Sequence, residues 1–245
     1  MTKAKLKQTD QLYKKEQKAL SPFTFNQDVS EVFDDMISRS IPGYDAIQSF
    51  VQTTTETHLS PNDHIYDLGC STGTTLHHIL TQTPHALRAT ALDYSEPMLT
   101  KAKEKLRHFQ NIQYLHRDLN DSFPIQKSAL ITAILTLQFI DKSNRKKVLS
   151  DCYQSLESGG LFILVEKVHH SDPSIQDLLT TTYHRFKSQQ GYSDIEIRQK
   201  QEALKTVLCP YTFEENMLLL KAVGFSNCDC FYRWGPFVGI VAKKD

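Results

Sequence analysis

Residues 65–73, with the sequence Ile-Tyr-Asp-Leu-Gly-Cys-Ser-Thr-Gly, combine the residue types that build a ligand pocket. A short apolar run leads to Asp67, and a turn containing Gly69 and Gly73 follows. Glycine lets the backbone approach a ligand closely, and a carboxylate at the end of a parallel strand faces the ligand crevice. The three residues between the glycines depart from the G-x-G-x-x-G spacing that admits a pyrophosphate. The loop and its acid therefore favour S-adenosylmethionine, which carries a sulfonium and an ammonium group and no pyrophosphate.

Asp93 ends the next apolar segment and is the second candidate for binding this cofactor. Its carboxylate can accept hydrogen bonds from both hydroxyls of a ribose. The alternative is an acid that only favours the dipole at the start of a helix. Tyr94 and Met98 follow. Each of them either packs on the face of the adenine or belongs to the core.

Two further segments place polar residues where they can face the same crevice. Asp118 follows a third short strand, where its carboxylate accepts from an adenine amino group or else lies in a solvated loop. We expect residues 135–139 to end the fourth strand on the side where a substrate lies. Gln138 is a polar residue in this apolar run, and we interpret it as lining the pocket because buried polar groups need partners. No metal site is predicted, since His169 and His170 are adjacent on an extended segment and point in opposite directions.

The order of the predicted elements supplies the sheet that these residues need. Short apolar segments alternate with amphipathic ones, which is typical of βαβ units and a parallel sheet. The expected strands are 64–68, 88–92, 112–116, 129–135, 161–166, 228–233 and 237–242. The expected helices are 29–39, 44–57, 74–83, 96–109, 143–156, 174–190, 194–208 and 212–223. We predict an α/β fold whose mostly parallel sheet has an antiparallel C-terminal edge strand. A helical N-terminal addition and a helical insertion at about 172–210 complete it.

Composition limits the class of protein. The 245 residues are 40% hydrophobic and 23% charged, which is ordinary for a globular protein. Lysine plus arginine and aspartate plus glutamate number 28 each, so no basic excess predicts direct binding to nucleic acid. We expect residues 1–22 to form a mobile or loosely docked arm and residues 23–245 to form one domain. No run of about 18 apolar residues predicts a membrane span, and five scattered cysteines favour reduced thiols in the cytoplasm.

Asp67, Asp93, Asp118 and the closing hairpin together resemble the class I S-adenosylmethionine-dependent methyltransferases, over about residues 60–245. A narrower resemblance, to the carboxy-S-adenosylmethionine synthases, spans nearly the whole chain past the arm. It rests on the stretches 29–44 (VSEVFDDMISRSIPGY), 66–71 (YDLGCS), 136–139 (TLQF), 166–167 (EK) and 184–196, which begins HRFK.

This resemblance implies a Rossmann-like class I methyltransferase fold and a homodimer. It also implies an enzyme that converts S-adenosylmethionine and prephenate to the carboxylated cofactor used in modifying the tRNA wobble uridine. Carried over residue by residue, it implies cofactor contacts from Tyr44, Gly69, Cys70, Ser71, Asp93, Tyr94, Asp118 and Leu119.

Two positions depart from the family pattern. Ile134 stands where the family has an asparagine that contacts the cofactor, and Gln201 stands where it has an arginine that pairs with the added carboxylate. A neutral amide cannot supply the bidentate, charge-assisted contact that arginine gives a carboxylate. Arg198, on the same helical face, and Arg39 are the candidates to replace that charge.

The leading hypothesis from the sequence is therefore an S-adenosylmethionine-dependent methyltransferase that acts on a small molecule and is related to the synthases. The alternatives are carboxy-S-adenosylmethionine synthase activity itself and a cofactor-binding module without catalysis. Holding the nucleophile in line supplies much of the catalysis of a direct methyl transfer, so no general base is named. Arg39, Gln138, Arg198 and Gln201 are the predicted substrate-side residues.

Overall fold

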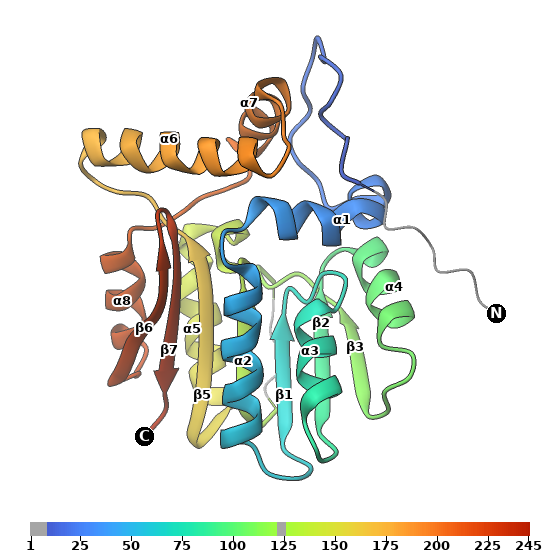
Figure 1. Cartoon of the computed structure of the whole chain (residues 1–245). Helices are drawn as coiled ribbons and strands as arrows, with labels where there is room; N and C mark the ends of the chain where they lie inside the picture. The colour runs from blue at the N-terminus through green and yellow to red at the C-terminus, as the bar shows by residue number, and fades with distance from the viewer. Residues whose placement is uncertain (1–8, 122–125) are drawn as a thin grey trace, which may run out of the picture.

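The computed structural model describes residues 9–121 and 126–245 (Figure 1). In this part of the chain one seven-stranded sheet has the order β3-β2-β1-β4-β5-β7-β6. The strands are β1 (His64–Leu68), β2 (Arg88–Asp93), β3 (Ile112–His116), β4 (Ser128–Ile134), β5 (Leu156–Lys167), β6 (Asn227–Trp234) and β7 (Phe237–Lys243). The helices are α1 (Gln27–Ser40), α2 (Tyr44–His58), α3 (Thr74–Gln82), α4 (Glu96–Lys105), the 3-10 helix η1 (Leu137–Phe139), α5 (Lys142–Ser155), α6 (Pro173–Gln189), α7 (Asp194–Leu204) and α8 (Phe213–Ala222).

The sheet is mostly parallel, as predicted. Strands β1 to β5 pair in parallel, whereas β7 runs antiparallel to both β5 and β6. The predicted Rossmann-like class I fold is confirmed, with β6 at the edge next to the antiparallel β7. Within the described residues, no helix combines the length and the apolar character that crossing a membrane requires.

Two hydrophobic clusters hold helices on opposite faces of the sheet. Helices α2, α3 and α4 pack on one face, where Leu76 and Leu99 join Ile65 of β1. Helices α5 and α8 cover the other face, where Val148 and Leu220 join the β-strand core. Because both faces are covered, β1 is buried along its whole length, which is usual for parallel strands.

Local sequence signals set the helix starts near the site. The Ser95 side chain caps α4 by accepting from the Met98 N–H at 3.3 Å. Ser193 and Glu196 form a reciprocal capping box at the start of α7, which satisfies two backbone N–H groups at once. These caps fix where α4 and α7 begin.

The prediction that residues 135–139 end the fourth strand is wrong. β4 ends at Ile134, Leu135 has a left-handed backbone (φ 59), and η1 follows. The turn is closed by the Phe139 N–H, which donates to the Thr136 carbonyl at 3.0 Å, and it is anchored by the Thr136 hydroxyl, which donates to the Leu68 carbonyl at 2.8 Å. Burial raises the pKa of the neighbouring Glu166 to about 8, and the backbone N–H groups of residues 136–138 act in the opposite direction.

Helices α1, α6 and α7 gather beyond the edge where the parallel strands end, and the N-terminal segment lies beside α1 and α7 there (Figure 1). Residues 9–23 make defined contacts, and residues 9–22 belong to the arm expected to be mobile or loosely docked. The Gln17 N–H donates to Oε1 of Gln199 at 2.6 Å, and the Phe23 N–H donates to the Ala203 carbonyl at 2.9 Å. Residues 1–8 of the arm lie outside the described residues.

Candidate active site

A cavity of about 730 Å³ lies at the edge where the parallel strands end. The strand ends supply part of its wall, and α1, α6 and α7 supply the rest. Ligands of open α/β sheets bind at this edge, and the volume is in the range of small-molecule sites. The cavity is therefore the candidate active site.

The loop after β1 and the acid that ends β2 form a braced unit in this wall. One carboxylate oxygen of Asp93 accepts from the Ser71 N–H at 2.8 Å, and the other accepts from the Ser95 N–H at 2.8 Å. Burial raises the pKa of Asp93, and these N–H groups act in the opposite direction. Asp93 thus fixes the glycine loop relative to α4 and still faces the cavity, where it can accept from ribose hydroxyls.

Gly69 is required by both its backbone and its surroundings. Its φ is +67, a left-handed value that side chains disfavour. A Cβ at this position would lie 2.5 Å from Oγ1 of Thr136, and that hydroxyl donates to the Leu68 carbonyl at 2.8 Å. The loop and the segment after β4 therefore pack with no side chain between them. This leaves backbone exposed to a ligand in the cavity.

An aromatic wall stands beside the braced unit. The Phe25 ring makes edge contacts with Tyr94 (centroids 6.0 Å apart) and Phe139 (5.1 Å). Asp118 and Leu119 line the cavity next to Tyr94. Tyr94 is 49% exposed, so its ring has a free surface on which an adenine can stack.

Four predicted cofactor residues do not line the cavity. Asp67 is 2% exposed and accepts from Oγ1 of Thr132 at 2.7 Å, and burial raises its pKa to about 7. Tyr44 is buried near it, and burial raises the pKa of its phenol. Met98 is fully buried in a cluster with residues of α1, which is the core-packing alternative. Cys70 is buried in the cluster that joins α3 to β1.

Three of the four predicted substrate-side residues line the cavity, and Arg39 does not. Gln138 accepts from the Lys167 N–H at 2.7 Å through its side chain. Arg198 reaches the wall, but its side chain is 67% exposed and paired with Glu16 at 3.6 Å. Gln201 also lies on the wall.

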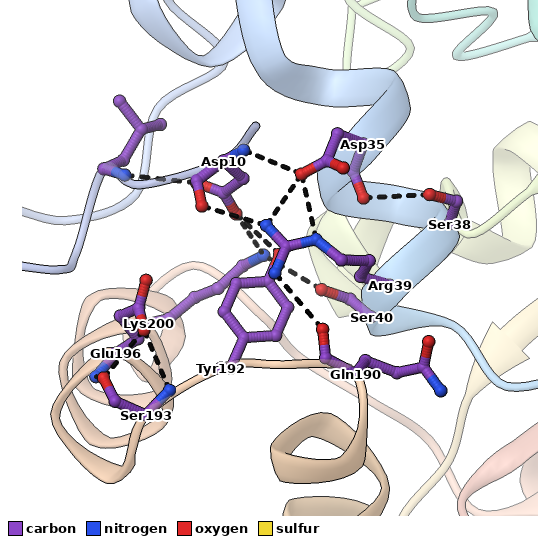
Figure 2. Close-up of polar contacts among 11 residues, drawn as sticks. Asp10, Asp35, Ser38, Arg39, Ser40, Gln190, Tyr192, Ser193, Glu196 and Lys200 are labelled. Atoms are coloured by element: carbon purple, nitrogen blue, oxygen red, sulfur yellow. Dashed lines mark hydrogen bonds and ion pairs between the residues drawn. The ribbon is translucent and has the colours of Figure 1, made fainter. Parts of the chain in front are cut away.

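Arg39 is engaged elsewhere (Figure 2). Its guanidinium pairs with Asp35 at 2.7 Å, donates to the Asp10 carbonyl at 2.9 Å and lies 4.1 Å from the centre of the Tyr192 ring. These contacts join α1 to the N-terminal segment and to the turn before α7. Arg39 therefore has its partners outside the cavity.

Three lysines bring positive charge into the other half of the cavity. The ammonium groups of Lys167 and Lys187 lie 4.9 Å and 4.5 Å from the centre of the same ring, that of Tyr183. Burial lowers the pKa of Lys187 to about 7, with help from the charges of Lys167 and Lys200. Burial also lowers the pKa of Lys200 to about 8. Negative charge bound beside these lysines would favour their protonated forms and so raise their pKa values.

Comparisons with known proteins identify the family of the chain. A family model described as "Methyltransferase domain" matches residues 65–160. The chain is 37% identical to the carboxy-S-adenosyl-L-methionine synthase of Methylococcus capsulatus, over 96% of this chain and 99% of that protein. It is 40% identical to the synthase of Nitratiruptor sp., over 91% and 93%. The chain belongs to the carboxy-S-adenosyl-L-methionine synthase family.

Solved structures show the same fold at lower identity. A putative O-methyltransferase from Nostoc punctiforme matches with a TM-score of 0.62 and 16% identity, over 89% of this chain and 59% of that chain. A putative S-adenosyl-L-methionine-dependent methyltransferase from Methanococcus maripaludis matches with a TM-score of 0.60 and 17% identity, over 93% and 97%. The protein is an S-adenosylmethionine-dependent transferase, and its cofactor is S-adenosylmethionine or the carboxylated derivative.

The residues present fit that cofactor. Gly69 leaves space and free backbone, Asp93 offers a carboxylate, and the aromatic wall offers a stacking surface. Both departures from the family pattern, Ile134 and Gln201, line the cavity, so each faces the space where ligands bind.

The sequence analysis did not predict the three lysines as site residues, although their positions in the sequence could have indicated them. Lys167 and Lys187 belong to stretches that carry the family resemblance, and Lys200 directly precedes Gln201. Their shared position became visible only in the folded chain, because β5, α6 and α7 each contribute one of them.

Proposed function

We propose that this enzyme makes carboxy-S-adenosyl-L-methionine from S-adenosylmethionine and prephenate. The observation that carries the proposal is the group formed by Lys167, Lys187 and Lys200 in the cavity. A neutral methyl acceptor would bring no negative charge to these lysines. Prephenate carries two carboxylates, and the carboxylated product carries a new one, so each compensates buried positive charge.

The lysines can also supply the positive charge that the family's arginine would give at the position of Gln201. A lysine acts as a compact point charge and not as a bidentate fork, and two or three lysines together can hold a carboxylate. Arg198 is a weaker candidate, since it is mostly exposed and already paired with Glu16, and exposed pairs contribute little. The amide of Gln201 can add a neutral hydrogen bond.

The reaction balances without a further reactant. The electron pair of one C–H bond of the sulfonium methyl group becomes the new C–C bond to the carboxyl carbon of prephenate. The pair of the broken ring–carboxyl bond enters the ring, which becomes aromatic and expels hydroxide. Hydroxide and the methyl proton leave together as water, and phenylpyruvate is the second product. Bound S-adenosylmethionine supplies the acidified methyl group, and the protein's own contribution is to orient two reactants and exclude solvent.

Carbon-13 labelling tests the proposal. The purified enzyme is incubated with S-adenosylmethionine and prephenate labelled at the ring carboxyl, and the cofactor is examined by mass spectrometry. We expect the label in the carboxylated cofactor together with one equivalent of phenylpyruvate. Absence of labelled cofactor, with methylated product from a panel of acceptors, would refute the proposal.

A pair of variants tests the role of the lysines. Lys187→Gln should raise KM for prephenate by about 10- to 100-fold, the effect of losing one charge-assisted hydrogen bond. KM for S-adenosylmethionine should change by less than about twofold, since the variant does not alter the glycine loop. Lys147→Gln, at a mostly exposed lysine of α5 paired with Asp151, is the matched control and should change neither constant.

A methyltransferase that acts on a small molecule is the second candidate. The substitutions Ile134 and Gln201, both on the cavity wall, favour it because they remove an amide and a guanidinium at the positions where the family contacts its carboxylated cofactor. Transfer of the methyl carbon itself, without gain of labelled carboxyl, would identify this activity.

Assembly and location are part of the same proposal. The family resemblance supports a homodimer, and the exposed apolar side chains Ile175 and Leu178 of α6 are available for an interface. The five cysteines are free thiols, which supports the cytoplasm, and the balanced charge argues against direct nucleic-acid binding. Light scattering of the purified enzyme should give twice the mass of one chain.

A further inference from the structure

Asp10 is a buried acid of the N-terminal segment that joins α1 to the turn before α7 (Figure 2). It is 2% exposed. Its N–H donates to Oδ2 of Asp35 at 2.7 Å, and its carbonyl accepts from the Arg39 guanidinium at 2.9 Å. Its carboxylate accepts from the Tyr192 hydroxyl at 2.7 Å. Backbone groups therefore hold Asp10 on α1, and its side chain is aimed at α7.

The same carboxylate faces a lysine of the cavity. Oδ2 of Asp10, the oxygen that Tyr192 holds, lies 3.9 Å from Nζ of Lys200. The ammonium group of Lys200 also donates to Oγ of Ser40 at 3.2 Å. Lys200 and Ser40 line the cavity, whereas Asp10 does not. Asp10 thus lies behind Lys200, outside the space where ligands bind.

Other charges around Lys200 do not replace Asp10. Arg39 of α1 opposes the charge of Lys200, while Asp35 of the same helix supports it less than Asp10 does. Lys187 of α6 is a further cation in the group, because the charge of Lys200 helps to lower its pKa. Tyr192 carries a hydroxyl whose pKa burial and Asp10 raise, so it stays a neutral donor. Asp10 is therefore the main anionic support of Lys200.

A neighbouring set of contacts keeps the segment on α7. The Gln199 side chain donates to the carbonyls of Tyr13 and Lys15 at 2.8 Å and 2.9 Å, and it accepts from the Gln17 N–H. Gln199 is buried and directly precedes Lys200. The backbone of residues 10–17 is thus fixed on the helix whose next residue enters the cavity.

We propose that Asp10 is a positioning residue for the anion-binding half of the cavity, where it holds Lys200 at the wall as a cation. The N-terminal segment is then part of the active site, although it contributes no group that touches the anion at this point. The inference rests on the proposed function, because the anion in question is a carboxylate of prephenate.

Asp10→Asn tests it, since the amide retains an acceptor for Tyr192 and nearly the same volume. An opposite charge at this distance shifts a pKa by about 1–3 units, so the pKa of Lys200, about 8 in this protein, should fall to about 7 or below. At about pH 8 the variant's Lys200 is then mostly neutral, and KM for prephenate should rise about tenfold. The difference should shrink as the pH is lowered toward and below the pKa of Lys200 in the variant. KM for S-adenosylmethionine should stay within about twofold at both values.

Glu16→Gln is the matched control. It makes the same change from acid to amide in the same segment, and it also removes a partner from a cation of α7, Arg198. That pair is exposed on both sides and should contribute little. We expect no change in either KM. Equal effects of the two substitutions, or a pH-independent rise in both KM values for Asp10→Asn, would overturn the proposal in favour of a purely structural role.

A measurement that does not need turnover separates this inference from the proposed function. Amines are labelled competitively with acetic anhydride over a pH series, and the peptide that contains Lys200 is quantified by mass spectrometry. The pH of half-maximal labelling should fall in Asp10→Asn and stay the same in Glu16→Gln. An unchanged value in Asp10→Asn would refute the positioning role. Absence of carboxylated cofactor from the wild type, with the labelling shift present, would refute only the proposed function.

Discussion

Gly69→Ala should destabilise the protein in two ways, through its backbone conformation and through atomic overlap. The same substitution at a second glycine, Gly159, separates these two contributions. Gly69 has φ +67, and an added Cβ would lie 2.5 Å and 2.6 Å from two side-chain atoms of Thr136. Gly159 has φ +79, and an added Cβ there meets no atom within 4 Å. Gly159→Ala therefore measures the cost of the left-handed backbone alone, whereas Gly69→Ala measures that cost plus the overlap.

The magnitudes follow from these contacts. A left-handed alanine costs about 1–2 kcal/mol, and this is the full effect expected for Gly159→Ala. At Gly69 the overlap adds about 1–3 kcal/mol of overpacking. Displacing Thr136 also weakens its hydrogen bond to the Leu68 carbonyl, which contributes about 0.5–1.5 kcal/mol. We expect Gly69→Ala to lower the free energy of unfolding by about 1.5–4.5 kcal/mol more than Gly159→Ala.

Urea unfolding of both variants measures the difference, and calorimetry with S-adenosylmethionine measures the consequence for the loop. Gly69→Ala should weaken cofactor binding at least about tenfold, since the loop and the Asp93 brace shift together, while Gly159→Ala should leave it unchanged. Thr136→Ala in the Gly69→Ala background should recover part of both losses because it removes the overlapping atoms. Equal unfolding free energies for the two glycine variants would show that the close packing against Thr136 is not the reason for glycine.

Three further predictions concern charged and polar side chains. Asp93→Asn should weaken S-adenosylmethionine binding by calorimetry about tenfold or more, because the carboxylate braces two backbone N–H groups and faces the ribose site. Lys187→Met should raise the free energy of unfolding by about 1–4 kcal/mol at about pH 6. That gain should shrink as the pH rises from about 7, the pKa of Lys187 in the folded protein, toward 10.5, its ordinary value, since the buried amine of the wild type is then neutral. An unchanged free energy of unfolding at about pH 6 would contradict this prediction. Burial lowers the pKa of His64 from 6.5 to about 4. As the pH falls from 6.5 to 4, the free energy of unfolding of the wild type should therefore decrease by up to about 3 kcal/mol, because His64 takes up its proton in the unfolded chain first. His64→Gln should flatten this slope in urea titrations.

Most of the fold could be read from the sequence because its local signals agree with the tertiary arrangement. The strands expected at 64–68 and 112–116 have those limits in the structure, where β1 is buried along its length and β3, at the edge of the sheet, is only partly buried. The segment after β4 was missed for a physical reason. Its turn is anchored by the Thr136 hydroxyl on the Leu68 carbonyl, which lies far away in sequence, and it needs a left-handed Leu135 that no local residue type signals.

Strand order accounts for part of the cavity wall, and side-chain packing decides the rest. Gly69, Asp93 and Asp118 follow strands that end at one edge, and sequence order alone places them together. Met98 was ambiguous because a helix position does not reveal which neighbour covers it, and it lies in the core with α1. Arg39 was considered as a substitute for the missing arginine, yet its guanidinium is held by Asp35 and Asp10.

The sequence by itself determined the cofactor class, because the glycine spacing and the acids at the strand ends act through the backbone and through strand order. It left open whether a carboxylate could bind beside the cofactor, since Gln201 had replaced the expected charge. Only the tertiary structure brought Lys167, Lys187 and Lys200 from three elements into one cavity, with Asp10 behind them. Burial lowers the pKa of all three lysines, and neighbouring charges contribute for Lys187 and Lys200. Neither burial nor these neighbours exist until the chain has folded.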